Sequence, residues 1–372
     1  MLKRTAIAVL LSGSALVALS ASAFADAASD GLAKAKENLA VYTAKPVFKA
    51  PGDPFDAKAC AAGKKQLSIP NSSANPFLKG IIDREKLAGA LVGLDVKEWE
   101  NQGQPAQWVQ GVELATREKY NIIDLISGID PGTLEQPLQA AKAAGVKVMT
   151  SHFYDPSFTP DPVVSSSLTI GFGEIGKILA DWATVATDGK ANIAIVVSRE
   201  VPPTIPLVDN FTKELAAVAP NAKIVQEINV GVTEWGTKIQ PGVQAVLQAH
   251  PEVNVVIPIY DSMSQFVVPA IRLAGKTGQV KVATFNGTPF VLDFIQQGAV
   301  DVDIGESLDW IAYATVDGHL RDACGLPTPT ALNVPFYIFD KSNAKEAGTP
   351  AQFDTGYGDA YKDGFQKLWG LK

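Results

Sequence analysis

The chain has 372 residues, of which 47% are hydrophobic and 19% are charged. This composition is typical of a packed globular protein, and the length favours roughly two domains. The net charge of −7 and the absence of a basic tract argue against a nucleic-acid-binding protein, because such proteins carry a positively charged surface. Its two cysteines, Cys60 and Cys324, have no partner at metal-binding spacing, so they form either one long-range disulfide or two free thiols.

The first 25 residues have the organisation of an export signal. Lys3 and Arg4 precede an apolar run over residues 6–19 that is too short to span a bilayer, and small residues before Asp26 offer a cleavage site. No cysteine follows that run, so a lipid anchor is not expected. We therefore expect cleavage after Ala25 and a soluble mature chain in a bacterial periplasm.

Residues 26–64 are rich in alanine and lysine and are then broken by prolines, which predicts a leading arm outside any sheet. From Lys65 onward, short apolar runs alternate with amphipathic helical patterns. The predicted strands are Gln66–Ile69, Val92–Val96, Ile122–Ile126, Val146–Thr150, Ile193–Val197, Ile224–Ile228, Val253–Ile257 and Val280–Phe285. Continuous apolar strands alternating with helices indicate an α/β fold with parallel sheets. Three prolines within residues 153–167 interrupt this alternation, and we interpret that segment as the approach to a second lobe.

In open parallel sheets, ligands bind beyond the carboxyl ends of the strands. The residues that follow the predicted strands are mostly neutral and polar, with aromatic residues between them: Asn71–Asn75, Glu98–Asn101, Ser127, Asp130, Ser151–Phe153, Ser198, Arg199, Thr233–Trp235, Tyr260, Asp261 and Asn286. Such a surface suits a small uncharged molecule with hydroxyl groups, because amides and hydroxyls pair with its polar groups and rings pack on its C–H faces. Arg199 is the exception, as a candidate anion ligand.

Several of these residues also have a purely structural interpretation. Asn75 precedes Pro76, an arrangement typical of a helix N-cap. His152 is as compatible with a hydrogen-bonded structural histidine as with a ligand contact, and for Trp235 a core position is slightly favoured. The stretch GFGEIG at residues 171–176 matches a dinucleotide-binding pattern, but Glu174 would oppose a pyrophosphate. Close helix packing explains its glycines better.

No nucleophile and base occur at recognisable spacing, which argues against an enzyme and gives no reason to expect a cofactor or a metal.

The order of four segments resembles the ribose-binding-like family of type 1 periplasmic binding proteins. The segments are NSSANPFLKGI, IIDLISGIDPGTLEQPLQAAKAAGVKVMT, AHPEVNVVIPIYDSM and VATFNGTP, and the resemblance extends from about Lys65 to Phe339. It implies two Rossmann-like lobes joined by a three-segment hinge, and a monomeric binding protein that delivers a small neutral solute to an ABC permease in the inner membrane.

Carried over by position, the family's ligand contacts fall on these residues: Asn71, Asn75, Phe77, Leu78, His152, Phe153, Ile205, Tyr260, Asn286 and Glu306. The resemblance implies that Asn71, Asn75, Tyr260, Asn286 and Glu306 hydrogen-bond the solute and that Phe77 and Phe153 cover it.

Several of these positions depart from the family pattern. The family's aspartate–arginine pair is replaced by His152 and Phe153, a further arginine by Ile205, and an aspartate by Asn286. Each lost charged hydrogen bond removes about 1.5 to 3 kcal/mol, which makes ribose itself doubtful. A deoxysugar, a polyol, a furanone-like or an aromatic compound remains open.

The resemblance also implies the lobe boundaries. Crossovers near Ser165, Glu306 and Pro335 predict a first lobe of residues 65–165 and 307–334, and a second lobe of residues 166–306 and 335–372. Cys60 and Cys324 then lie together at the base of the first lobe, which favours the disulfide. Two alternatives remain: a sensor subunit that serves a chemoreceptor or sensor kinase, and an exported hydrolase or isomerase that uses His152 with Asp261 or Glu306.

Overall fold

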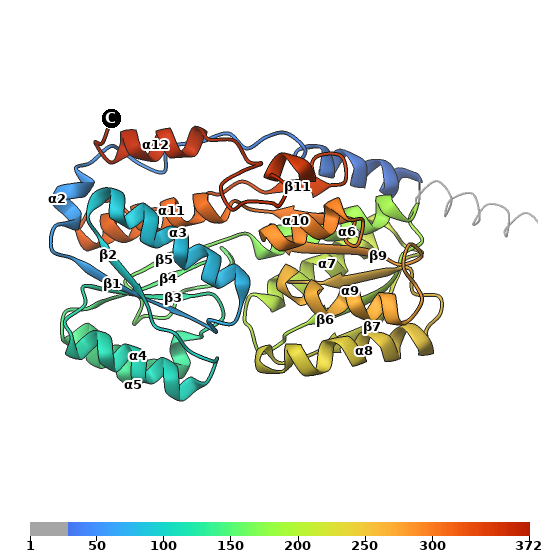
Figure 1. Cartoon of the computed structure of the whole chain (residues 1–372), viewed down its shortest axis with the longest axis horizontal. Coiled ribbons are helices and arrows are strands. Elements are labelled where there is room, and N and C mark those ends of the chain that lie inside the picture. Colours follow the sequence, from blue (N-terminus) through green and yellow to red (C-terminus); the bar gives the residue numbers. More distant parts are fainter. Residues whose placement is uncertain (1–28) are drawn as a thin grey trace, which may run out of the picture.

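The computed structural model describes residues 29–372, so the predicted signal segment lies outside the described residues. The described chain forms two α/β lobes that lie side by side (Figure 1). Within residues 29–372, one sheet has five strands in the order β2-β1-β3-β4-β5, and the other has six in the order β11-β10-β9-β8-β6-β7. The predicted α/β fold class with two lobes is confirmed.

The strands of the first lobe are all parallel: β1 (Lys65–Pro70), β2 (Asp95–Glu98), β3 (Ile122–Ile126), β4 (Lys147–Ser151) and β5 (Ser166–Leu168). The start predicted for β2 at Val92 is wrong. The preceding helix continues to Val92 and ends at Gly93, whose φ of 85° suits a glycine C-cap. The short, serine-rich β5 was not predicted, because it lacks the apolar run of a buried strand.

The second sheet contains β6 (Asn192–Val197), β7 (Lys223–Asn229), β8 (Val255–Pro258), β9 (Lys281–Asn286), β10 (Val302–Gly305) and β11 (Tyr337–Asp340). Strands β10 and β11 are absent from the prediction. Strand β11 pairs antiparallel with β10, so this sheet is parallel except at one edge.

Helices cover both faces of the first sheet (Figure 1). Its helical elements are α2 (Ala57–Ala61), α3 (Pro76–Val92), α4 (Pro105–Arg117), η1 (Pro131–Leu134), α5 (Glu135–Ala143), α11 (Leu308–Ala323) and α12 (Ala360–Leu368). Helices α3 and α11 share one core with α12, in which Ile81, Ile311 and Phe365 are buried. Helices α4 and α5 close the other face, where Val112 and Leu138 pack with Leu67 of β1.

The second sheet is likewise enclosed by α6 (Phe172–Ala186), α7 (Thr204–Val218), η2 (Val232–Glu234), α8 (Trp235–Ala249), η3 (Asp261–Met263), α9 (Ser264–Leu273), α10 (Pro289–Gln296) and η4 (Ala344–Ala347). Helices α6 and α7 touch so closely at Gly176 that a Cβ there would lie 2.1 Å from the carbonyl oxygen of Leu207. This close approach confirms the packing interpretation of the GFGEIG stretch for Gly176.

The arm before β1 connects the two lobes. Its helix at residues 29–40 packs on the second lobe, where Ala35 is fully buried in the core and the carbonyl of Tyr42 accepts a hydrogen bond of 2.9 Å from Ile338 N. Phe48 then reaches the first lobe, with its ring centroid 5.9 Å from Trp310 and 5.1 Å from Phe365. In Figure 1 this segment follows the upper edge of the molecule from one lobe to the other.

A disulfide between Cys60 and Cys324, with Cα atoms 6.0 Å apart, joins α2 to the end of α11, as expected. No helix in the described part of the chain is long and apolar enough to cross a membrane.

The C-terminal segment also changes lobes. Tyr357 packs on Phe339 of the second lobe, with ring centroids 5.0 Å apart, whereas Tyr361 stacks on Trp310 of the first lobe at 4.9 Å. The structure thus differs from the expectation that residues 335–372 lie wholly in the second lobe, because the buried aromatic face of α12 packs on α11.

Candidate ligand-binding site

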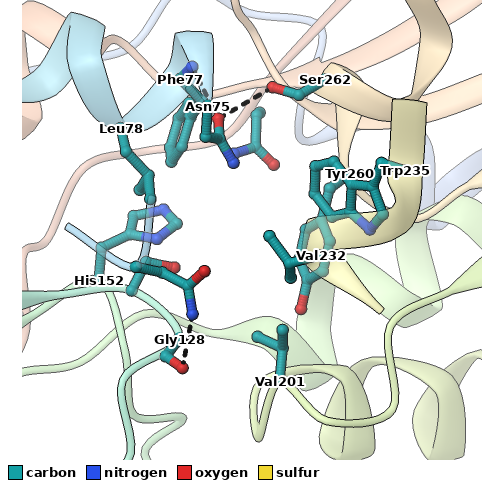
Figure 2. Close-up of a pocket in the computed structure, with 13 residues that line it drawn as sticks. Asn75, Phe77, Leu78, Gly128, His152, Val201, Val232, Trp235, Tyr260 and Ser262 are labelled. Carbon is teal, nitrogen blue, oxygen red and sulfur yellow. Dashed lines mark hydrogen bonds between the residues drawn. The ribbon is translucent and has the colours of Figure 1, made fainter. Parts of the chain in front are cut away.

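A pocket lies between the lobes, where the carboxyl ends of both sheets meet (Figure 2). Its empty space of about 430 Å³ is partly open to solvent, and its lining residues are Asn71, Asn75, Phe77, Leu78, Ser127, Gly128, His152, Val201, Val232, Trp235, Tyr260, Ser262 and Asn286. Each of these residues ends a strand, follows one or begins the next helix. The pocket therefore occupies the position that the strand-end rule predicts.

The first loop presents two amides to the pocket. Asn71 directly follows β1, and its Nδ2 donates a hydrogen bond of 3.0 Å to the carbonyl of Gly128. Asn75 is the N-cap of α3, where its Oδ1 accepts from the backbone N–H of Phe77 at 3.0 Å. The capping interpretation of Asn75 is confirmed, and its amide Nδ2 is a separate atom with which a ligand can interact.

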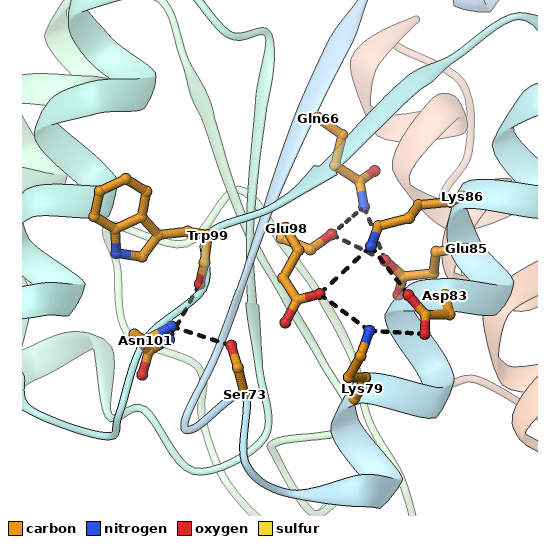
Figure 3. A network of polar contacts seen from close by, with 10 residues as sticks. Gln66, Ser73, Lys79, Asp83, Glu85, Lys86, Glu98, Trp99 and Asn101 are labelled. Carbon is orange, nitrogen blue, oxygen red and sulfur yellow. Dashed lines mark hydrogen bonds and ion pairs between the residues drawn. The ribbon is translucent and has the colours of Figure 1, made fainter.

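Polar contacts from the loop after β2 fix the conformation of this first loop (Figure 3). The backbone N–H of Asn101 donates to Ser73 Oγ at 3.1 Å, and Asn101 Nδ2 donates to the carbonyl of Pro70 at 2.9 Å. Lys86 pairs with Glu98 at 3.4 Å and so ties α3 to the end of β2. The loop that carries Asn71 and Asn75 is thus held on both sides.

One hydrogen bond from this loop crosses between the lobes. Ser262 Oγ, which follows β8 in the second lobe, donates to Asn75 Oδ1 at 3.2 Å (Figure 2). This contact requires the lobes to be close together, so the structure represents a closed arrangement of the pocket.

His152 follows β4 in the first lobe, and its Nε2 contacts the carboxylate of Glu306, which follows β10 in the second. Both side chains are buried, at 2% and 0% exposure. Burial raises the pKa of the Glu306 carboxyl, and the adjacent His152 acts in the opposite direction. His152 Nδ1 is buried and has no hydrogen-bond partner among the described residues.

The side of the pocket formed by the second lobe is largely apolar. The ring of Tyr260 lies beside that of Trp235, with centroids 6.4 Å apart and planes at 27°. Their polar ends are occupied elsewhere: Trp235 Nε1 donates to Ser198 Oγ at 2.8 Å, and the Tyr260 hydroxyl pairs with Thr204 Oγ1 at 3.0 Å. Burial raises the pKa of the Tyr260 phenol, so it remains neutral. Val201 and Val232 complete this wall (Figure 2).

Asn286 ends β9 and is the remaining polar residue of the second lobe that lines the pocket. Its Oδ1 is buried without a partner in the described part of the chain. Asn286, His152 and Ser127 have positive φ angles of 145°, 52° and 41°, which are uncommon for residues other than glycine. Such conformations concentrate at functional sites, where surrounding structure must hold them in place.

The comparisons with known proteins agree with the two-lobed fold. The model of the periplasmic binding protein domain family matches residues 67–318, which is more than half of the chain. The chain belongs to the periplasmic binding protein domain family.

Among curated periplasmic binding proteins, the ribose import binding proteins RbsB of Salmonella typhimurium and Escherichia coli are each 26% identical to this chain over 264 residues, which cover 70% of this chain and 85% of theirs.

Solved structures of solute-binding proteins share the fold. A solute-binding protein from Agrobacterium vitis with bound allitol has a TM-score of 0.67 at 17% identity, covering 78% of this chain and 99% of that one. A 5-methylthioribose transporter solute-binding protein from Thermotoga lettingae has a TM-score of 0.68 at 19% identity, covering 82% and 98%. The arm before residue 67 and the segment after residue 318 lie outside the family match.

The pocket of this periplasmic binding protein gathers seven of the ten positions to which the resemblance assigned ligand contacts: Asn71, Asn75, Phe77, Leu78, His152, Tyr260 and Asn286. Phe153 is not among the lining residues but is buried against Tyr154, with ring centroids 4.6 Å apart. Glu306 contacts His152 and does not itself line the pocket. Ile205, to which the resemblance assigned a contact, is 44% exposed on α7 and also lies outside it.

Six lining residues were not among the predicted ligand contacts: Ser127, Gly128, Val201, Val232, Trp235 and Ser262. Ser127 appeared among the strand-end residues, but no ligand contact was assigned to it. Trp235 appeared among the strand-end residues, but the core interpretation was preferred for it. The two valines gave no signal, because apolar residues in loops also serve as packing.

Proposed function

We propose that this protein is the solute-binding component of an ABC importer and that it binds a small neutral sugar-like molecule or polyol between its lobes. The curated relatives are named ribose import binding proteins, and structural neighbours have bound allitol or D-allose, which supports this ligand class. We place the mature protein in the periplasm as a monomer, with an inner-membrane ABC permease as its partner. No cofactor and no nucleic acid enter this proposal.

The observation that carries the proposal is a pair of buried polar atoms that lack hydrogen-bond partners within residues 29–372. His152 Nδ1 belongs to the first lobe and Asn286 Oδ1 to the second, and both residues line the same pocket. Leaving a buried polar atom unpaired costs about 1 to 3 kcal/mol. A hydroxylated ligand removes this cost, because a hydroxyl group can donate to Asn286 Oδ1 and can either donate to or accept from His152 Nδ1.

The lining also favours a neutral ligand over an anion. None of the residues that line the pocket within residues 29–372 is a lysine or an arginine. Arg199, the cation predicted near this edge, pairs with Glu227, with its Nε 2.9 Å from Oε1. A carboxylate or phosphate would enter such a pocket without a counter-charge, at a high desolvation cost.

Ligand binding then couples to lobe closure. The ligand contacts both lobes only when they are together, so binding shifts the population toward the closed form. A permease can distinguish that form because both lobe surfaces then have one fixed relative position.

A thermal-shift screen with ribose, allitol, D-allose, D-tagatose and myo-inositol tests the ligand class. A binder at about 100 times its dissociation constant stabilises the protein by about 2.7 kcal/mol, which raises the melting temperature by roughly 4 °C at this size. Asn286→Ala should remove the shift and leave the unliganded melting temperature unchanged. Asn221→Ala, at an exposed turn before β7, is the matched control and should keep the shift.

Incubating the purified protein with the compound found in this screen tests the alternative that His152 acts as a catalytic base. If the protein is a receptor, the bound compound is recovered unchanged after prolonged incubation. Turnover of the compound would contradict the proposal, as would equal loss of melting temperature and ligand response in Asn286→Ala.

A further inference from the structure

We infer that the ligand carries an apolar face or substituent that lies against the second lobe, opposite the edge that bears its hydroxyl groups. This inference rests on the proposed function and narrows the ligand to neutral hydroxyl compounds with a deoxy, methyl or aromatic part. Its basis is the unequal chemistry of the two sides of the pocket.

On the second-lobe side, four side chains form a continuous apolar wall: Val201, Val232, Trp235 and Tyr260 (Figure 2). Tryptophan and tyrosine often hydrogen-bond ligands through their polar ends, but here Ser198 accepts from the indole N–H and Thr204 pairs with the phenol. Ser198 Oγ is in turn occupied, because it donates to the carbonyl of Val230 at 2.6 Å. The wall therefore offers a ligand mainly ring faces and methyl groups.

The opposite side is where hydroxyl groups find partners. Asn71, Ser127 and His152 come from the first lobe, and the second lobe contributes Asn286 at the end of β9. Among the lining residues that the structure describes, the buried side-chain atoms without a partner are His152 Nδ1 and Asn286 Oδ1. A sugar that bears hydroxyl groups all around its ring would bring several of them against the wall, where they would lose water and gain no hydrogen bond.

Charged side chains near the pocket do not supply the missing hydrogen-bond partners for ligand hydroxyl groups. The carboxylate of Glu306 is engaged by His152, and Asp261 accepts a hydrogen bond of 2.7 Å from the backbone N–H of Thr288. These two carboxylates therefore bond to other groups of the protein and are not free to make strong charge-assisted hydrogen bonds with hydroxyl groups of the ligand. Replacing one ligand hydroxyl by hydrogen or by a methyl group on the wall side should thus increase affinity.

Calorimetric titration with matched pairs tests this inference. L-Rhamnose is compared with L-mannose, and L-fucose with L-galactose, since each pair differs by one hydroxyl group; benzyl alcohol and myo-inositol extend the range of polarity. We expect the deoxy member of at least one pair to bind about tenfold more tightly than its parent. Val232→Thr should reduce that preference several-fold, whereas Val41→Thr, at a side chain that is 70% exposed, should not change it.

The outcomes separate the two proposals. If the fully hydroxylated members or myo-inositol bind more tightly than the deoxy and aromatic compounds, the apolar-face inference is overturned and the solute-binding proposal stands. If no compound of either kind binds, the proposed ligand class itself fails. A preference for the deoxy member that Val232→Thr leaves intact would also overturn the inference, because the wall would not be its source.

Discussion

The imidazole of His152 contacts the carboxylate of Glu306 in the protein interior, and this contact joins the end of β4 in one lobe to the end of β10 in the other. It fixes which ring nitrogen faces Glu306, and the other, Nδ1, has no hydrogen-bond partner among the described residues. The pair therefore acts on the ligand indirectly, by orienting the histidine.

Removing one partner of this pair should destabilise the protein strongly. Glu306→Ala leaves the buried His152 without its partner, and loss of one member of a buried pair typically costs about 3 to 5 kcal/mol. Glu306→Gln keeps an oxygen acceptor and should cost much less. Urea denaturation at neutral pH measures both variants, and equal losses would show that the hydrogen bond contributes little beyond the charge.

Asn75 should show separate effects on stability and on binding. Asn75→Ala removes the N-cap of α3 and should lower the free energy of unfolding by about 1 kcal/mol. Asn75→Asp keeps the capping oxygen and should retain stability, but it replaces the amide donor and should weaken the ligand-induced thermal shift. If Asn75→Asp binds ligand like the wild type, Asn75 is only a cap.

Stability should depend on pH through Asp124, which is fully buried in the first lobe. Burial raises the pKa of Asp124 from 3.8 to about 8, and Ser151 Oγ donates to it at 2.8 Å. Between these values the folded state keeps a proton that the unfolded chain releases, so Asp124 makes stability fall as pH rises.

The clearest window for that effect is pH 6.5 to 8. The neighbouring His319 has the opposite effect, because burial lowers its pKa to about 3 and its contribution ends near its ordinary value of 6.5. Asp124→Asn should therefore flatten the decline in unfolding free energy between these pH values. An unchanged slope in denaturation curves would mean that Asp124 is ionised in the folded state.

The disulfide closes a loop of 264 residues, so its removal should release considerable chain entropy on unfolding. In the chain-entropy model, such a loop contributes up to about 5 kcal/mol. Reductant should lower the denaturation midpoint of the wild type, and the Cys60→Ala/Cys324→Ala double variant should be insensitive to it. A midpoint that reductant does not change would contradict a formed disulfide in solution.

The leading arm should detach when its helix is displaced from α7. A Cβ on Gly31 would lie 2.1 Å from the carbonyl oxygen of Val218, so Gly31→Val cannot be accommodated in the docked position. Limited proteolysis should then cleave within residues 29–47 and leave the lobes intact. Ala33→Val, at an exposed position of the same helix, serves as a control for this substitution. Equal protection of the arm in Gly31→Val would show that its docking tolerates the added bulk.

The polar residues at the strand ends could be predicted from the sequence, whereas contacts between distant segments of the chain could not. Asn71 and Asn286 follow apolar runs, and the orientation of parallel strands is enough to place both at one edge. Strand β10 escaped prediction because Asp303 interrupts its apolar run, although the side chain is fully buried and accepts a hydrogen bond from Gly287 N. The position of Phe153 depended on a side-chain direction that strand order does not specify.

The sequence by itself determined the α/β alternation, the two lobes and the polar loops at the strand ends, because these follow from local periodicity and from the geometry of parallel strands. Only the tertiary structure decided that Glu306 meets His152, that Trp235 and Tyr260 turn their polar ends away from the pocket, and that the arm and α12 cross between lobes. Those features depend on packing between residues far apart in the chain, and no local pattern encodes which side chains meet.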